Sequence, residues 1–384
     1  MRASTLLALL PVAMAAPSIV KRSSLAPIIT PRDAQVIDGK YIVKFKDDII
    51  KTAVTSAISS ISAKADYTYS EAFNGFAGSL TPEEVETLQN DPTVEYLEQD
   101  AVISISATQS NAPWGLARIS SSEPGGTTYT YDANPGAGTC AYIVDTGIDT
   151  THSEFGGRAS FAANFVDSND GDGEGHGTHV AGTVGGITYG VAKETTLYAV
   201  KVLGDDGSGS TSGVVAGMQF VVTDAPSRSC PSGVVVNMSL GGGYSSSINS
   251  AAAAIVDAGI FLAVAAGNDG ADAESSSPAS APSACTVGAT DSSDVLAYFS
   301  NYGSVVDVLA PGVDILSSIP GGGSETLSGT SMASPHVAGL GAYLLGKGSS
   351  VSDLCSTIAS SALENVISDV PSGTANLLIN NGYK

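Results

Sequence analysis

Short apolar runs alternate with helical patterns through the C-terminal three quarters of the chain, and this alternation is the strongest constraint on its fold. Near-continuous apolar runs are typical of parallel strands in a sheet that helices cover on both faces. The strand candidates are Ala141–Asp145, Thr196–Leu203, Gly233–Leu240, Ile260–Ala266, Cys285–Ala289 and Val305–Leu309. The helix candidates are Gly177–Gly185, Thr211–Val222, Ile248–Ala258, Ser331–Leu345 and Val351–Ala362. We therefore expect an α/β fold with a doubly wound, mainly parallel sheet, and functional sites at the carboxyl ends of its strands.

Three polar side chains stand where these predicted elements begin or end. Asp145 closes the first apolar strand, and His176, in the segment 175–182, begins a helix. Ser331, in the segment 329–339, lies among small residues at the start of another helix. A hydroxyl at a helix start lies near unpaired N–H groups and the positive end of the helix dipole. These groups stabilise a nucleophile and the oxyanion that its attack creates, so Ser331 is the candidate nucleophile.

From about Ala107 to its C-terminus, the chain resembles the subtilisin-family serine endopeptidases, and within them the fungal proteinase K-like enzymes. The order Asp, His, Ser is that of the subtilisins and differs from the chymotrypsin and α/β-hydrolase orders. The resemblance implies that Asp145 orients the imidazole of His176, and that His176 serves as the general base for Ser331. It also implies that the amide of Asn268 donates to the oxyanion, together with the backbone N–H of Ser331.

Two glycine-rich segments predict where a substrate chain lies. The segment 239–242 ends an apolar strand without bulk, so an extended peptide could add to it as a further strand. The segment 207–209 resembles the opposite strand of the family's cleft. The residues assigned to substrate binding are Gly207, Gly209, Ser239, Leu240, Gly241, Gly242, Ala265 and Gly267. The last four of these residues, Gly241, Gly242, Ala265 and Gly267, are expected to line the pocket for P1, the residue before the cleaved bond. Because they place no charge at the base of that pocket, we expect broad specificity with a preference for aromatic or large apolar residues at P1.

The first third of the chain predicts export and maturation. Residues 1–15 have a basic start, an apolar core and a small-residue cleavage pattern, as in a secretory signal. Residues 16–106 follow as a propeptide, with a domain at about 35–105, and residues 107–384 form the peptidase domain. In the propeptide, the strands Lys40–Lys46, Phe73–Leu80 and Val94–Ile105, the helix Ile49–Ser62 and a second helix after Thr81 suggest an α+β ferredoxin-like unit. The resemblance implies an inhibitor and folding assistant that is removed by self-processing within about three residues of Ser106–Ala107.

Charge and hydropathy limit the partners. The net charge of −22 argues against nucleic acid, because a phosphate backbone would be repelled. The part before residue 107 has 9 basic and 13 acidic residues, and the rest has 7 and 25, so most of the negative charge belongs to the peptidase domain. This acidity suits solubility outside the cell, or the binding of cationic substrates or calcium. We expect a secreted, extracellular monomer that acts on polypeptides and has no membrane span.

Secretion makes the four cysteines candidates for disulfides, and their spacing leaves all three pairings open. The resemblance implies Cys140–Cys230 and Cys285–Cys355. It also implies a structural calcium ion held by Asp307 and by the backbone carbonyls of Pro282 and Ala284, with no organic cofactor. The sequon that begins at Asn237 is not expected to carry a glycan, because it lies in an apolar strand. His152 is expected in a surface loop, and His179 and His336 are expected to take no part in catalysis.

Other functions remain open at this stage. A protein that keeps the fold without activity would show the same apolar pattern, although an intact set of Asp145, His176, Ser331 and Asn268 argues against it. An esterase of the α/β-hydrolase type would need Gly-x-Ser-x-Gly, and Ala333 stands where the second glycine belongs. His176 and His179 could share a helix face for a metal, but the His-Glu-x-x-His pattern is absent.

Overall fold

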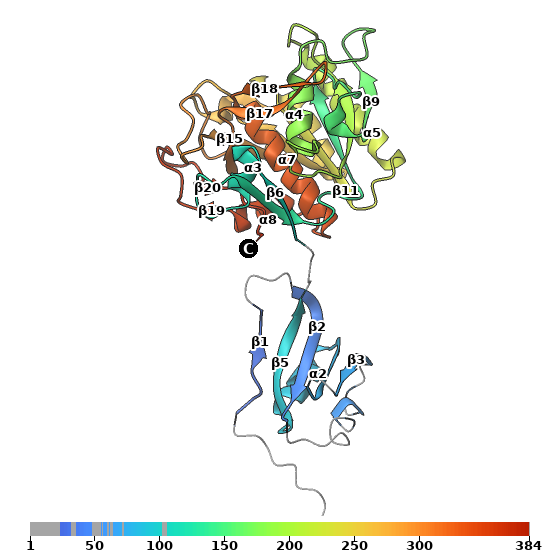
Figure 1. The fold of residues 1–384 in the computed structure, drawn as a ribbon. Coiled ribbons are helices and arrows are strands. Elements are labelled where there is room, and N and C mark those ends of the chain that lie inside the picture. Colours follow the sequence, from blue (N-terminus) through green and yellow to red (C-terminus); the bar gives the residue numbers. More distant parts are fainter. Residues whose placement is uncertain are drawn as a thin grey trace, which may run out of the picture. The chain divides into compact units, whose positions relative to one another are not determined.

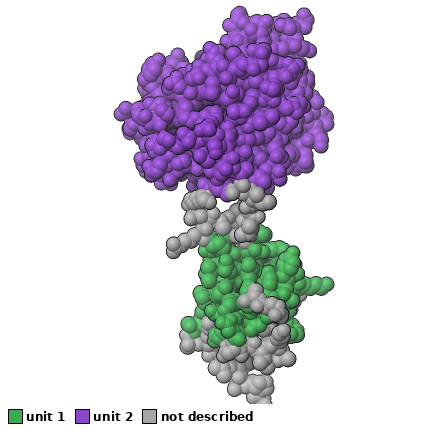
Figure 2. Space-filling view, viewed as in Figure 1, with its two compact units in different colours: residues 1–104 green, residues 105–384 purple. Residues whose placement is uncertain are grey.

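The computed structural model describes residues 24–31, 36–47, 55, 57–59, 61, 64–70, 73–101 and 106–383. The chain divides into two compact units, Met1–Ser104 and Ile105–Lys384, which Figures 1 and 2 show. Three predicted features lie wholly or mostly outside the described residues: the signal segment 1–15, the helix Ile49–Ser62 and the end of the strand that leads to the cleavage point. Each unit is described by itself below.

The first unit contains a five-stranded sheet with the order β1-β5-β2-β4-β3. Its last four strands are antiparallel neighbours in a ferredoxin-like order, which confirms the expected α+β class. Helix α2 begins with the predicted capping box, in which Thr81 and Glu84 exchange hydrogen bonds between side chain and backbone. The element bounds are β1 Ile28–Ile29, β2 Val36–Phe45, β3 Ala65–Tyr69, β4 Gly75–Ser79, α2 Pro82–Asn90 and β5 Val94–Ala101.

Two edge strands of this unit, β1 and β3, were not among the predicted elements. Strand β1 pairs with β5 through only two residues, and both of them are exposed. Strand β3 is half-buried at most, so it carries no run of apolar residues that would mark it. Weak burial therefore explains why the sequence pattern missed them.

The second unit is built on a nine-stranded sheet with the order β19-β20-β16-β15-β13-β11-β8-β10-β9. All neighbouring strands run parallel except β19 and β20, as expected for a doubly wound fold. From one edge to the other, the strands are Leu363–Glu364, Leu377–Leu378, Val308–Pro311, Cys285–Thr290, Phe261–Ala265, Gly233–Met238, Thr139–Asp145, Thr196–Lys201 and Ala159–Asn164.

Helices cover both faces of this sheet, and each face has its own cluster of buried apolar residues. Successive residues of β8 point to opposite faces, so Ile143 joins one cluster while Tyr142 and Val144 join the other. The first cluster packs α3 Trp114–Ile119, α4 His176–Gly185, α7 Thr330–Gly346 and α8 Leu354–Ser361. The second packs α5 Thr211–Asp224 and α6 Ser246–Asp257. Figure 1 shows α7 crossing the middle of the unit, which agrees with its almost complete burial.

Several small elements of the second unit were not predicted. They are short or largely polar, so they lack the apolar run on which the strand predictions depended. The strands are β6 Ser106–Ser110, β7 Thr128–Asp132, β9 Ala159–Asn164, β12 Gly242–Gly243, β14 Ser276–Ser277, β17 Ile315–Ile319, β18 Gly323–Leu327 and the edge strands β19 and β20, and the short helix α3 was also not predicted. The 3-10 helices are Ser153–Phe155, Ala225–Ser227 and Ala273–Ser275. Within the described ranges, no helix combines the length and the apolar character that crossing a bilayer requires.

Two disulfides hold the second unit, and both pairings are those implied by the family resemblance. Cys140 of β8 is joined to Cys230, and Cys285 of β15 is joined to Cys355 of α8. The bonded residues are 90 and 70 positions apart in sequence. In the chain-entropy model, closing loops of this length stabilises a fold by about 4 kcal/mol each.

Candidate active site

Asp145 and His176 meet where β8 ends and α4 begins. The Nδ1 atom of His176 lies 2.7 Å from Oδ1 of Asp145, and the backbone N–H of Thr146 donates to the same oxygen over 2.7 Å. The side chain of Asp145 is completely buried. Its Oδ2 atom has no hydrogen-bond partner in the part of the chain that the structure describes. Among the described residues, Oδ1 therefore makes all the hydrogen bonds of this carboxylate, including the one to the imidazole.

A second buried carboxylate, Asp172, fixes the start of α4. It accepts hydrogen bonds from the hydroxyl of Thr146 over 2.8 Å, from the backbone of Gly175 over 2.8 Å, and from both donors of Thr178. The Thr146 hydroxyl accepts in turn from the N–H of Gly177 over 2.8 Å. A Cβ at Gly177 would lie 2.0 Å from a backbone oxygen of the β8 loop, so only glycine allows this approach. Sequence reasoning missed Asp172, because its position among several acidic residues gave no signal.

The charges around His176 counteract the effect of burial on the pKa of its imidazole. Burial alone would lower the pKa of the imidazole, and the charge of Asp145, with its hydrogen bond, outweighs that effect. Glu174 and Asp172 add to the same direction, so the pKa of His176 is raised to about 9. The ring therefore lies in a field that stabilises its protonated form.

Ser331 is the second residue of α7 and is clamped through its backbone by Ser239. Its carbonyl would normally accept from the N–H four residues later, but that residue is Pro335, which has no N–H. The Ser239 hydroxyl donates to this carbonyl over 2.7 Å instead. The Ser331 hydroxyl donates back to the Ser239 carbonyl over 3.1 Å. The two residues thus lock the end of β11 to the start of α7.

His176 and Ser331 line the same cavity of about 490 Å³. Among the described residues, no hydrogen bond joins them, because the Ser331 hydroxyl is turned toward Ser239. Catalytic contacts are often long in unliganded sites and tighten when a substrate binds.

Asn268 lies next to Ser331 and has a defined amide orientation. Its Oδ1 atom accepts from the backbone N–H of Thr330 over 2.8 Å and from the Thr330 hydroxyl over 2.9 Å. That hydroxyl also accepts from the N–H of Gly267 over 3.1 Å. Since the oxygen is used in this way, the amide nitrogen is left for the cavity of about 510 Å³ that Asn268 and Ser331 both line. Thr330 was not predicted as part of the site, and no sequence signal marked it.

The walls of this second cavity are formed mostly by small residues. They include the predicted residues Ala265 and Gly267 and the segment 240–243. A Cβ at Gly242 would meet no atom within 4 Å, so glycine there keeps the wall open. The lining contains one charged side chain, Asp269, and it is exposed to solvent. The cavity is therefore suited to a bulky uncharged side chain.

The predicted substrate strands flank the cavity that His176 lines. Gly207, Gly209 and the segment 239–242 all line it. One detail differs from expectation, because Gly242 belongs to β12, which already pairs with β14. The edge left for an added strand is therefore 239–241.

Asp307 lies beside the segment that contains Pro282 and Ala284. Its Oδ2 atom accepts from the backbone N–H of Thr286 over 2.8 Å. Burial raises its pKa, and the Thr286 hydrogen bond opposes the rise. No cationic side chain in the described ranges forms an ion pair with it. Cys285 and Cys355 also lie nearby, but their disulfide prevents them from acting as ligands.

Four other residues discussed in the sequence analysis lie in the interior. His152 was expected in a surface loop, and this prediction is wrong: it is 5% exposed, and its Nε2 atom lies 2.9 Å from the carbonyl of Gly323 in β18. His179 and His336 are buried, and burial lowers the pKa of each to about 4. Asn237 is fully buried and donates to Ser239 over 2.9 Å, so it cannot accept a glycan in the folded chain.

Two family profiles match the chain. One, described as "Subtilase family", matches residues 136–376. The other, described as "Peptidase inhibitor I9", matches residues 40–106. The two matches fall in different units of the structure, apart from the last two residues of the second match.

Relatives match over the full length or over the second unit. A cuticle-degrading protease of Metarhizium anisopliae is 53% identical over all of both chains. Proteinase R of Parengyodontium album is 52% identical over all of both chains, and Proteinase T of the same organism is 68% identical over 75% of this chain and 99% of its own. A crystal structure of a cold adapted subtilisin-like serine proteinase is 45% identical, covers 71% of this chain and 99% of its own, and superposes with a TM-score of 0.67.

Proposed function

Because this chain belongs to the subtilase family of serine endopeptidases, we propose that it hydrolyses polypeptides through Asp145, His176 and Ser331. The observation that carries the proposal is the hydrogen bond between His176 and the buried Asp145, in a cavity that also contains Ser331. Ser331 attacks the peptide carbonyl and passes its proton to His176, which then protonates the leaving amine. Water releases the acyl-enzyme by the reverse roles.

The oxyanion of this reaction forms next to Ser331. The Nδ2 amide of Asn268 and the backbone N–H of Ser331 are the proposed donors. The backbone N–H and the hydroxyl of Thr330 both donate to Oδ1 of Asn268, so the direction of the Nδ2 donor is fixed before substrate binds. Losing one such donor lowers turnover by about 10²–10³-fold in comparable sites.

The substrate backbone pairs with the free edge 239–241 on one side and with Gly207 and Gly209 on the other. The P1 side chain enters the cavity of about 510 Å³, whose alanine and glycine walls select aromatic or large apolar residues. We expect a peptide anilide with Phe at P1 to be cleaved at least tenfold more efficiently than one with Lys or Glu there. A covalent serine-directed inhibitor should abolish cleavage, and an unaffected rate would rule out the serine mechanism. Measurement of kcat/KM for the three substrates tests the preference.

The pH dependence of cleavage follows from the raised pKa of His176. Only the neutral imidazole accepts a proton, so kcat/KM rises as the pH increases through that pKa. We expect the acid limb of the profile to have its midpoint above the ordinary value of 6.5. The same shift stabilises the fold below pH 6.5, and this contribution is lost as the pH rises through about 9. A midpoint at or below 6.5, measured with an uncharged substrate, would contradict the dominance of Asp145.

The chain is proposed to be made as a secreted precursor. Residues 1–15 are the signal, 16–106 the propeptide and 107–384 the mature enzyme, with self-processing near Ser106–Ala107. The inhibitor-family match to residues 40–106 supports this division. The propeptide is expected to assist folding and to inhibit the enzyme until it is removed. The mature enzyme acts as an extracellular monomer, and its negative charge disfavours nucleic acid as a partner.

A structural calcium ion is proposed at Asp307, with the carbonyl oxygens of Pro282 and Ala284 as further ligands. The ion would neutralise a carboxylate that burial destabilises. Excess chelator is expected to lower the melting temperature by several degrees in the wild type, and by much less in Asp307→Asn. Thermal unfolding with and without chelator checks this, and an equal decrease in both proteins would remove Asp307 as a ligand.

A further inference from the structure

Lys201 is a fully buried cation beside the end of the strand that carries Asp145. It is the last residue of β10, which pairs with β8 in parallel, and its register partner is Asp145. Two residues earlier, Ala199 and Ile143 belong to the same apolar cluster, so Lys201 and Asp145 also leave the sheet on one face. A buried charge is costly unless it is paired and hydrogen-bonded, so the partners of this ammonium indicate its role.

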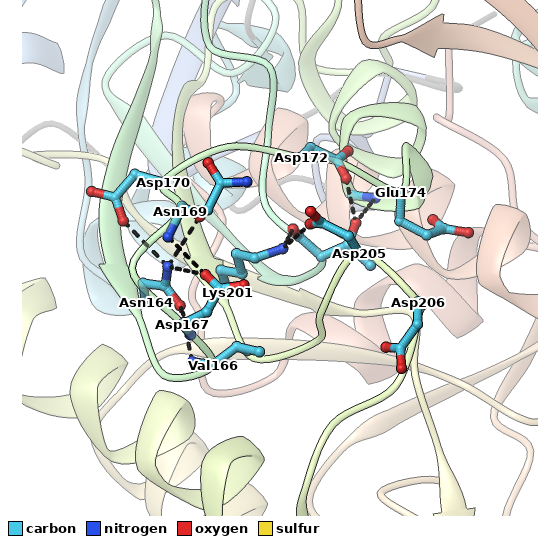
Figure 3. A network of polar contacts seen from close by, with 12 residues as sticks. Asn164, Val166, Asp167, Asn169, Asp170, Asp172, Glu174, Lys201, Asp205 and Asp206 are labelled. Atoms are coloured by element: carbon cyan, nitrogen blue, oxygen red, sulfur yellow. Dashed lines mark hydrogen bonds and ion pairs between the residues drawn. The ribbon is translucent and has the colours of Figure 1, made fainter.

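The ammonium of Lys201 joins the loop after β8 to the loop after β10. Its Nζ atom donates to the carbonyl of Thr146 over 2.7 Å and to Oδ1 of Asp205 over 3.1 Å. Figure 3 shows the Lys201 side chain pointing to Asp205. The carboxylate of Asp205 is half-exposed, so water can stabilise it without the ammonium. Thr146 is only 1% exposed, so its carbonyl depends on a donor from the protein.

Thr146 is the residue through which this contact reaches the catalytic pair. Its N–H donates to Oδ1 of Asp145, and its hydroxyl connects Asp172 to the first turn of α4. The next residue, Gly147, has a φ of 115°, and glycine restrains the orientation of the preceding peptide less than any other residue. The hydrogen bond from Lys201 to the Thr146 carbonyl therefore restrains the peptide that joins Thr146 to Gly147.

We propose that Lys201 is a positioning residue for the pair formed by Asp145 and His176. Its ammonium holds the Thr146 carbonyl, so the turn after β8 keeps the Thr146 N–H on Oδ1 of Asp145. That oxygen is the one that lies 2.7 Å from Nδ1 of His176. This inference rests on the proposed function, because the positioned pair is the one assigned to proton transfer. Lys201 lines neither cavity, so its loss is expected to lower kcat and to leave KM almost unchanged.

The test compares Lys201→Met with Lys193→Met in purified mature enzyme, because methionine is similar in length to lysine but has neither charge nor N–H. Lys193 is the matched control: its half-buried ammonium also donates to two oxygens, the carbonyls of Ile187 and Gly190, over 3.1 Å and 2.9 Å. It too lines neither cavity. The measurements are kcat and KM for a peptide anilide with Phe at P1, and the strongly deshielded proton NMR signal of Nδ1–H of His176. This signal reports the hydrogen bond to the catalytic carboxylate and does not depend on turnover.

We expect Lys201→Met to lower kcat by about 10- to 100-fold, because a small misplacement of catalytic groups has effects of this size. Its KM should stay within about threefold of the wild type, and its Nδ1 proton signal should weaken and shift. Lys193→Met should lose thermal stability to a similar degree but keep both kcat and the signal. A folded Lys201→Met with the kcat and the signal of Lys193→Met would overturn the proposal, because Lys201 would then be a purely structural residue.

A second pair of variants decides the question if Lys201→Met does not fold. Asp205→Asn weakens the half-exposed partner of the ammonium, and Asp206→Asn is its control, because Asp206 is exposed on the same loop and accepts from Ser208. We expect kcat to fall about threefold in Asp205→Asn and to stay unchanged in Asp206→Asn, and equal values would overturn the proposal. A wild type that cleaves nothing would reject the proposed function alone if its Nδ1 proton signal is still perturbed in Asp205→Asn.

Discussion

Ser331→Ala is expected to lower kcat for a Phe peptide anilide by about 10⁶-fold, which is the loss known for the nucleophile of a related subtilisin. The variant lacks the only group proposed to attack the carbonyl. The structural loss is small, since among the described residues the Ser331 hydroxyl makes one hydrogen bond, to the carbonyl of Ser239. Residual hydrolysis of about 10³–10⁴-fold over water should remain, because the oxyanion donors and the substrate cleft are intact.

The control for this variant is Ser334→Ala. Ser334 is the other serine of the segment 329–339, but it is fully buried and donates to Asn237 over 2.9 Å. Its removal should cost stability and leave turnover within a few-fold of the wild type. Burst kinetics and active-site titration of both variants measure the difference. Near-normal turnover in Ser331→Ala, or a collapse in a folded Ser334→Ala, would assign the nucleophile elsewhere.

Asp145→Asn is expected to reduce kcat by about 10⁴-fold while the protein stays folded. The carboxylate accepts from Nδ1 of His176, so it leaves Nε2 free to receive the Ser331 proton. An amide nitrogen at that place would favour the opposite tautomer and would not stabilise the imidazolium. The exchange keeps the shape of the side chain, so packing around β8 should be preserved.

Asp149→Asn is the matched control, because Asp149 is the other carboxylate of the same motif. Its oxygens accept from Thr151 and from the N–H of Gly321, away from the imidazole. Turnover should change less than threefold in this variant. Steady-state kinetics at several pH values, with circular dichroism to show folding, decide the comparison. Comparable losses in the two variants would mean that Asp145 acts through charge at a distance.

Some of the candidate site was predictable because each residue has a local signal. Asp145 ends an apolar strand, and Ser331 begins a helix rich in small residues. The carboxyl ends of parallel strands meet at one edge of a sheet, so their proximity was expected. The disulfide pairs came from family resemblance, since spacing alone left three pairings open.

Other parts depend on contacts that no local pattern encodes. The wrong prediction for His152 is one example, because a polar residue in a Ser- and Thr-rich loop gives no sign that Gly323, 171 positions later, will cover it. Thr330 and Asp172 are further examples, since hydroxyls and carboxylates are common in loops. Their roles become visible only through the distances to Asn268 and to the first turn of α4.

The sequence by itself determined the fold class, the six central strands and the longer helices of the second unit, and the identity of the three candidate catalytic residues. These depend on apolar periodicity and on motifs, which are properties of short segments. Only the tertiary structure decided that Ser239 replaces the hydrogen bond missing at Pro335, that Thr330 orients the Asn268 amide, and that Asp172 fixes the first turn of α4. Each of these depends on the packing of segments far apart in the chain, and hydrogen bonds and charges act over distances of a few ångströms in space rather than along the sequence.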